Sequence, residues 1–162
     1  MAKRFVSRVG NIFCVEISDK EKGFFQYITT DMSNLNSSVI RVFKRRYPID
    51  AQPTMDEIVD DDIDFYAHTV LKYGYLYNVW YKVGTHKNVG DTENIMFRVL
   101  TDTPWVNIVK SHNWYVWKIN CESEYVGELN EEQRKYDMGF VYSWPQIVNR
   151  IKTGQWLSKY PL

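Results

Sequence analysis

The residues best suited to catalysis or metal binding are few in this chain and lie far apart. The histidines are His68, His86 and His112, and none lies at an i, i+2 or i, i+4 spacing or in an H-E-x-x-H pattern that would bring zinc ligands together. The sequence also lacks a G-x-S-x-G turn, a P-loop lysine motif and a dinucleotide-binding glycine pattern. We therefore predict a protein that is not an enzyme and that uses no metal and no cofactor.

The two cysteines offer no obvious redox or metal chemistry. Cys14 and Cys121 lie in strand-like apolar runs, far apart, without C-x-x-C spacing or a histidine at a metal-ligand interval. Because small packed thiols behave as hydrophobic side chains, two buried free thiols are favoured over a disulfide.

The most concentrated charge is an acidic run between residues 56 and 64. One interpretation is a solvated loop whose first acids stabilise a helix N-terminus. The other is an acidic surface for a basic partner, since such charge speeds association and sets specificity. A calcium site is not predicted, because the D-x-[DN]-x-[DN]-G spacing is absent. The candidate partner-binding residues are Asp60, Asp61, Asp62, Asp64 and Tyr66.

A basic and aromatic segment precedes this acidic run. It carries Arg41, Phe43, Arg45 and Tyr47 on one face of an expected strand. Guanidinium groups alternating with rings could follow a phosphate backbone, which would make the protein a small β-barrel that binds nucleic acid. The same pattern is typical of a charged edge strand that resists pairing with other chains. Either interpretation places this strand in an exposed or edge position.

Length and charge restrict the remaining possibilities. The chain has 162 residues, with 20 Lys and Arg balancing 20 Asp and Glu, so no overall field draws it toward nucleic acid or anionic lipid. Its start lacks the apolar core of a signal peptide, and no stretch approaches the length of an apolar membrane span. We expect one domain over residues 1–162, in the cytoplasm and without a membrane partner.

Strand-forming runs must position these residues. Three apolar and aromatic runs, at 9–17, 23–31 and 38–47, alternate with polar turns and predict an antiparallel meander. The first run is apolar on both faces and should be covered on both sides. Further strands are predicted at 64–73, 79–83, 94–100, 113–120 and 124–129, with residues 84–91 as a loop. A short helix beginning near Thr92 is the alternative to the strand at 94–100.

Two helices are predicted from their capping signals. Thr54-x-x-Glu57 after Pro53 forms a capping box for a short helix that ends near residue 60. Ser143-x-x-Gln146 begins a second helix, whose stripe is Trp144, Ile147, Val148 and Ile151 and whose end is marked by Gly154. The expected fold is α+β: a strongly bent antiparallel sheet or partly open barrel with the C-terminal helix packed on it and one short helix after Pro53.

The N-terminal third resembles a bacterial family. The opening GNIFCVEI, the aromatic run GFFQYI and the apolar and basic third strand are similar to the G-D-I-F-x-[IV] opening of immunity-protein family twenty-six of polymorphic toxin systems. Asn11 stands where that opening more often has Asp, and WYKVG at 80–84 is a second, weaker match. The resemblance implies a β-rich α+β protein that binds a cognate toxin, encoded nearby, and blocks it by occlusion. It carries over no catalytic residue.

Overall fold

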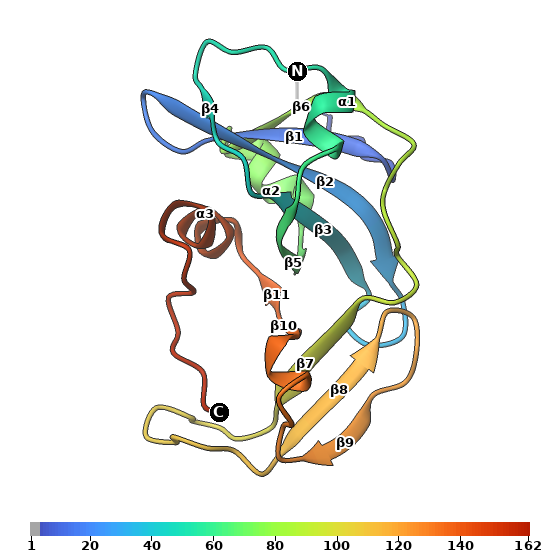
Figure 1. Cartoon of the computed structure of the whole chain (residues 1–162), viewed down its shortest axis with the longest axis vertical. Coiled ribbons are helices and arrows are strands. Elements are labelled where there is room, and N and C mark those ends of the chain that lie inside the picture. Colours follow the sequence, from blue (N-terminus) through green and yellow to red (C-terminus); the bar gives the residue numbers. More distant parts are fainter. Residues whose placement is uncertain (1–3) are drawn as a thin grey trace.

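The computed structural model describes residues 4–162, which form a mixed α+β fold with two β-sheets (Figure 1). The first sheet contains β1 (Asn11–Glu16), β2 (Glu21–Asp31), β3 (Ser37–Phe43), β4 (Tyr47–Pro48), β5 (Ile63–Thr69), β6 (Trp80–Thr85) and β11 (Val141–Tyr142). The second contains β7 (Met96–Leu100), β8 (Trp114–Lys118), β9 (Glu124–Gly127) and β10 (Asp137–Met138). The helices are α1 (Met55–Val59), α2 (Leu71–Leu76), α3 (Trp144–Thr153) and the 3-10 turn η1 (Gln133–Lys135).

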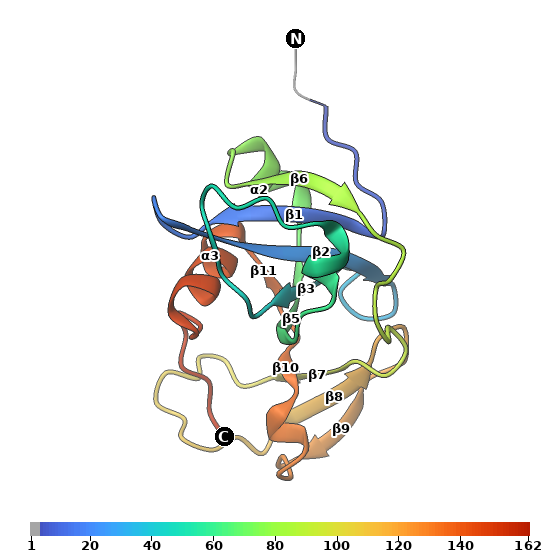
Figure 2. The same ribbon diagram turned by 45° about the horizontal axis from the view of Figure 1, so that its top comes forward.

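This arrangement confirms the predicted α+β class, the short helix after Pro53 and the C-terminal helix. The first sheet has the order β11-β5-β3-β2-β1-β6, with β4 beside β2. Its end strands, β11 and β6, are not paired with each other, so the sheet stays open. The longer strands pair in antiparallel fashion, and two short pairs are parallel, β11 with β5 and β10 with β7. Both β10 and β11 belong to the segment that runs from the second sheet to the first (Figure 2).

The central strands of the first sheet are covered on both faces, as predicted for β1. The side chains of Ile12, Phe13 and Cys14 are fully buried. The predicted exposed or edge position of the third strand is wrong. β3 lies between β2 and β5, and its last five residues are buried. Its one internal cation, Arg41, is accommodated there because Gln26 Oε1 and the Asn88 carbonyl accept its hydrogen bonds.

The predicted strand at 64–73 ends early. β5 stops at Thr69, and α2 begins at Leu71. The buried indole of Trp80 explains the break, since its Nε1 donates to the Leu71 carbonyl at 2.9 Å. A Cβ at Gly74 would lie 2.0 Å from the Trp80 ring, so only glycine lets the helical turn close against it.

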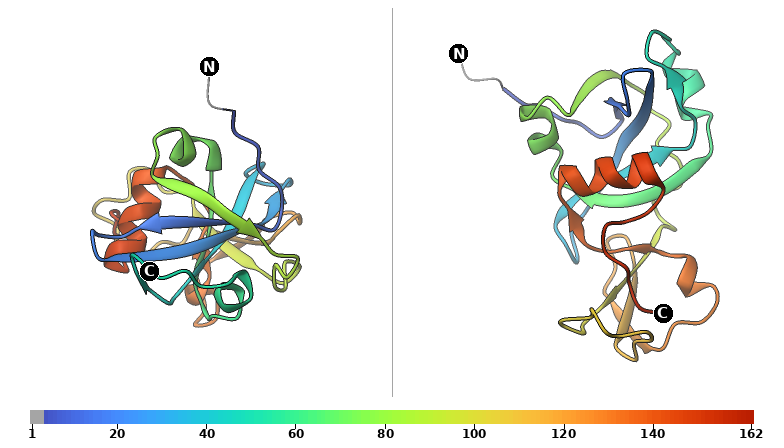
Figure 3. Two further views of the ribbon diagram at one scale, coloured as in Figure 1. Left: turned by 90° about the horizontal axis from the view of Figure 1, so that it is seen from above. Right: turned by 90° about the vertical axis from the view of Figure 1, so that its left-hand side faces the viewer.

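Helix α3 begins and ends as its sequence predicts. Gln146 Oε1 accepts from the Ser143 backbone N–H at 2.9 Å, and Gly154 ends the helix with φ of 77°. Ile147 and Ile151 are buried against the first sheet, and each contributes roughly 1.5–3 kcal/mol. Figure 3 (right) shows α3 across this sheet and the chain after it running toward the second sheet. One apolar cluster contains these side chains together with Trp114 and Val116 of the second sheet.

The predictions for the cysteines and for membrane-spanning helices can also be compared with the structure. Both cysteines are free thiols, and Cys14 is buried as expected, but Cys121 is exposed because it lies in the turn after β8. The longest helix in residues 4–162 has ten residues. None of the described helices therefore reaches the length of about 20 apolar residues that spans a bilayer.

Candidate functional site

The exposed carboxylates of α1 and the turn after it form what we call the acidic ridge: Asp56, Glu57, Asp60 and Asp62. Thr54 begins the helix, and its Oγ1 accepts from the Glu57 backbone N–H at 3.2 Å. Asp56 lies 2.7 Å from His86 Nε2. Within residues 4–162, the side chains of Asp60 and Asp62 have no hydrogen bond or ion pair, so they present their charge to solvent.

The other predicted partner-binding residues have different surroundings. Asp61 is structural, because its Oδ2 accepts from the Arg45 backbone N–H at 2.6 Å and its Oδ1 from the Asp62 N–H at 2.8 Å. Asp64 lies 3.6 Å from Arg150 on α3. Tyr66 lines a separate hollow with Asp91 and Asp137 rather than joining the acidic ridge.

The predicted nucleic-acid-binding residues do not share an exposed surface. Arg41, Phe43 and Tyr47 are buried, while Arg45 is exposed. Arg41 Nε donates to Gln26 Oε1 at 2.9 Å, and its Nη2 donates to the Asn88 carbonyl at 2.8 Å. The guanidinium carbon of Arg45 lies 4.7 Å from the centre of the Tyr47 ring. Arg41 therefore stabilises the interior of the first sheet, and Arg45 packs on a ring at its edge.

A second charged feature, which we call the basic cleft, has a volume of about 580 Å³. Its walls are β7, the segment from η1 to β10, the end of α3 and the chain at 154–160. Cations dominate its lining, with Asp137 as the single carboxylate: they are Arg98, Arg134, Lys135, Arg150 and Lys159. Aromatic side chains complete it: Tyr136, Trp156 and Tyr160.

Asp137 lies between the two parts of the fold. Its Oδ2 accepts from the Tyr66 backbone N–H at 2.9 Å, which links β10 to β5. Burial raises the pKa of Asp137 to about 6, and the nearby cations Arg150 and Arg98 only partly oppose this rise. The charge of this carboxylate therefore changes at a pH below neutral but well above that of an exposed aspartate.

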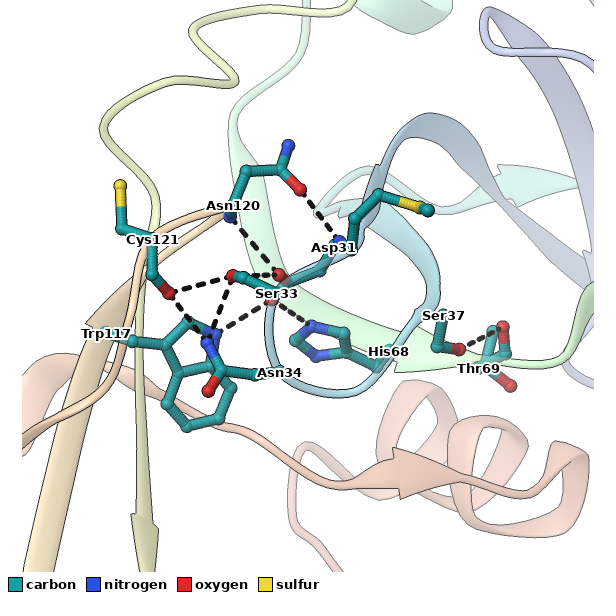
Figure 4. Close-up of polar contacts among 10 residues, drawn as sticks. Asp31, Ser33, Asn34, Ser37, His68, Thr69, Trp117, Asn120 and Cys121 are labelled. Atoms are coloured by element: carbon teal, nitrogen blue, oxygen red, sulfur yellow. Dashed lines mark hydrogen bonds and ion pairs between the residues drawn. The ribbon is translucent and has the colours of Figure 1, made fainter.

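A buried polar network, which we call the Asp31 clamp, joins the two sheets (Figure 4). Asp31 Oδ2, at the end of β2, accepts from Trp117 Nε1 on β8 at 2.8 Å. It also lies 3.0 Å from His68 Nε2 on β5. The second oxygen, Oδ1, accepts from the Asn120 backbone N–H at 3.2 Å. Three strands or strand ends from both sheets thus converge on one carboxylate.

The protonation of the Asp31 clamp follows from its burial. Both His68 and Asp31 have no solvent exposure. Desolvation lowers the pKa of His68 despite the hydrogen bond and charge of Asp31, so the ring is neutral and donates its Nε2–H to the carboxylate. Hydrogen bonds from Trp117, His68 and Asn120 together outweigh burial and lower the pKa of Asp31. His68 Nδ1 has no hydrogen-bond partner in the described structure.

The Asp31 clamp places a histidine beside a carboxylate, as a catalytic triad does, but solvent and substrate have no access to it. No substrate can reach a ring that is fully buried and packed 4.3 Å from the centre of Phe97. Among residues 4–162, no three His, Cys, Asp or Glu side chains are grouped in a way that would hold a metal ion. The buried Asp31 clamp therefore connects parts of the fold.

Sequence reasoning found the acidic ridge but missed the Asp31 clamp and the basic cleft. The cations of the cleft are spread from Arg98 to Lys159, so no local pattern joins them. Asp31 carried one usable signal, because it ends the aromatic run at 23–31 and an acid buried there requires hydrogen-bond donors. Comparisons with protein-family models, with curated proteins and with solved structures found no match for this chain.

Proposed function

We propose that this chain is an immunity protein that binds a cognate bacterial toxin, encoded nearby, and blocks it by occlusion without catalysis. The observation that carries the proposal is the acidic ridge, whose carboxylates are exposed and, at Asp60 and Asp62, unpaired within the described residues. The resemblance of the N-terminal third to immunity-protein family twenty-six supports the same function.

The acidic ridge rests on a rigid base. Ile58 and Val59 of α1 are buried in an apolar cluster that includes Phe24 and Phe43. Because the helix is held by this packing, little backbone ordering is needed when a partner binds, and preorganised surfaces lose less entropy on association. A negative surface of this kind favours a toxin whose substrate groove is basic, as in a nuclease, and it would speed the encounter most at low ionic strength.

The first experiment is co-expression of this chain with the toxin encoded beside it. We expect rescue of growth and co-purification of the two proteins. The absence of both would overturn the proposed function itself.

The second experiment tests the surface with the double variant Asp60→Asn/Asp62→Asn, which keeps the structural Asp61. Its association rate should fall several-fold at about 50 mM salt and approach the wild-type rate at about 500 mM, where charges are screened within a few ångströms. The matched control is Glu122→Gln/Glu124→Gln, which removes the same charge from exposed positions at the start of β9 and in the turn before it. Equal rates for both variants would remove the acidic ridge from the interface.

The alternative of nucleic-acid binding through Arg41, Phe43, Arg45 and Tyr47 receives no support from this arrangement. Three of the four side chains are buried in the first sheet. We therefore do not propose it.

A further inference from the structure

We infer that the basic cleft is a binding site for the phosphate group of a small molecule. This role goes beyond toxin binding, because the cleft and the acidic ridge have no lining residue in common. Its volume of about 580 Å³ lies within the range of about 300–1,000 Å³ that small-molecule sites occupy.

Arg98 is the central group of this site. It is partly buried on β7, and its Nε donates to the Tyr136 carbonyl at 2.9 Å. Its guanidinium carbon lies 5.2 Å from the centre of the Trp114 ring, so the group packs against this buried indole. Within residues 4–162, neither Nη atom has a hydrogen-bond acceptor. Two donors of one rigid guanidinium are therefore available for bidentate contact with an oxyanion.

The surroundings of Arg98 add positive charge. Burial lowers the pKa of Arg98, and the like charge of Arg134 acts in the same direction, whereas Asp137 opposes it. Arg134 and Lys159 have no ion-pair partner among the described residues, although both line the cleft. An anion between these three cations would replace their mutual repulsion by attraction.

The aromatic side chains of the lining, Tyr136, Trp156 and Tyr160, form an aromatic wall that indicates what else the ligand can contact. The Trp156 ring stacks on Tyr142 at 3.7 Å between centroids and 8° between planes. Tyr142 Oη is in turn 2.8 Å from Tyr160 Oη. The chain after α3 is fastened where the Leu162 N–H donates to the Val109 carbonyl at 2.8 Å. The wall is therefore held in place, and a ring-bearing phosphate such as a nucleotide has an aromatic surface beside the cations.

A doubly charged phosphate suits this site better than a carboxylate. Two Nη donors match two oxygens of one group, and the cations at Arg134 and Lys159 can meet the remaining charge. The phosphate could belong to free inorganic phosphate or to a mononucleotide, and these two sources share the same recognition chemistry.

The test is calorimetric titration of the full chain with inorganic phosphate and with adenosine monophosphate at constant ionic strength, with chloride as the reference anion. Binding of phosphate over chloride supports the site. Tighter binding of the nucleotide shows that the aromatic wall contributes, and equal binding shows that the phosphate alone is recognised.

The variant Arg134→Gln/Lys159→Gln changes exposed side chains and should leave the fold intact. It should weaken phosphate binding by about tenfold, because charge-assisted contacts are among the stronger hydrogen bonds. The matched control Lys20→Gln/Lys44→Gln removes the same charge at exposed positions outside the cleft and should change the affinity less than about twofold. Asp137→Asn, which removes the only carboxylate of the lining, should tighten binding at pH 7.

Three results would overturn the inference. One is the absence of phosphate binding at millimolar concentration. Another is an equal loss of affinity in the cleft variant and in its control. The third is binding of an oligonucleotide without any binding of phosphate or mononucleotide, which would indicate a macromolecular partner instead.

Discussion

The change Asp31→Asn tests whether the Asp31 clamp holds the two sheets together. In the native protein, Asp31 Oδ2 accepts from Trp117 Nε1 and His68 Nε2, while Oδ1 accepts from the Asn120 backbone N–H. Asparagine keeps one acceptor oxygen and turns the other position into an NH₂ donor. Whichever way the amide is oriented, a donor then faces a donor inside the protein.

The expected cost follows from these contacts. If the amide oxygen stays toward Asn120, the Trp117 and His68 N–H groups both lose their acceptor. If the oxygen faces Trp117 and His68 instead, only the Asn120 N–H loses its acceptor, and a hydrogen bond to a charged group contributes about 1.5–3 kcal/mol. We therefore expect the free energy of unfolding to fall by at least about 1.5–3 kcal/mol, a large part of the 5–15 kcal/mol typical of a domain.

Urea denaturation measures this loss as a lower midpoint with an unchanged slope. Asp62→Asn provides the control, because it makes the same chemical change at an exposed position and should stay within about 0.5 kcal/mol of wild type. A double-mutant cycle with Trp117→Phe should give a coupling energy of about 1–3 kcal/mol. A loss below about 1 kcal/mol for Asp31→Asn would refute the view that this carboxylate joins the sheets.

Three other changes give further tests. Because burial lowers the pKa of His68 below its usual 6.5, the unfolded chain binds the proton first. The contribution of His68 to stability should then be lost as the pH drops below 6.5, and His68→Gln should lack this contribution. Burial raises the pKa of Asp137 from 3.8 to about 6, so the contribution of Asp137 is lost as the pH rises through this window and opposes that of His68. A scan of Tm against pH should therefore rise more steeply with pH in Asp137→Asn than in wild type across this window. Gly74→Ala would place a methyl group 2.0 Å from the Trp80 ring, and denaturation should show a loss of at least about 1–3 kcal/mol, whereas a neutral result would mean that α2 moves freely.

The parts of the fold that were predicted correctly depend on local chemistry. Thr54 and Ser143 mark the starts of α1 and α3 because their partners lie within one turn: the Thr54 side chain accepts from the Glu57 N–H, and the Gln146 side chain accepts from the Ser143 N–H. The hairpin of β1 and β2 follows in the same way from two apolar runs and a polar turn. In each case the decisive contacts lie within a short stretch of sequence.

The errors occur where distant residues decide the structure. Arg41 looked like an exposed cation, but its acceptors are Gln26 and Asn88, which lie 15 and 47 residues away. Tyr73 continued a period of two, but Trp80 imposed a helical turn at Gly74. A single sequence does not contain these pairings as a pattern, so the charge of Arg41 and the alternation before Gly74 gave misleading predictions.

The basic cleft was missed for the same reason, because its residues come from distant parts of the chain. The two proposed surfaces also lie on different parts of the fold. Arg98 belongs to the second sheet, whereas Arg150 lies on α3, which packs against the first sheet. The acidic ridge rests on the first sheet alone, through Ile58 and Val59. Loosening the Asp31 clamp should therefore shift the walls of the cleft against each other while leaving the ridge and its support unchanged.

Asp31→Asn, studied at a temperature where it remains folded, should accordingly weaken phosphate binding and leave toxin association at the wild-type rate. The two measurements are the calorimetric titration and the association kinetics described above. Asp62→Asn changes the acidic ridge and not the Asp31 clamp, so it should slow toxin association and leave phosphate binding unchanged. If Asp31→Asn slowed toxin association as much as it weakened phosphate binding, the two sheets would move as one body. The Asp31 clamp would then be a contribution to overall stability rather than a specific connection between the walls of the cleft.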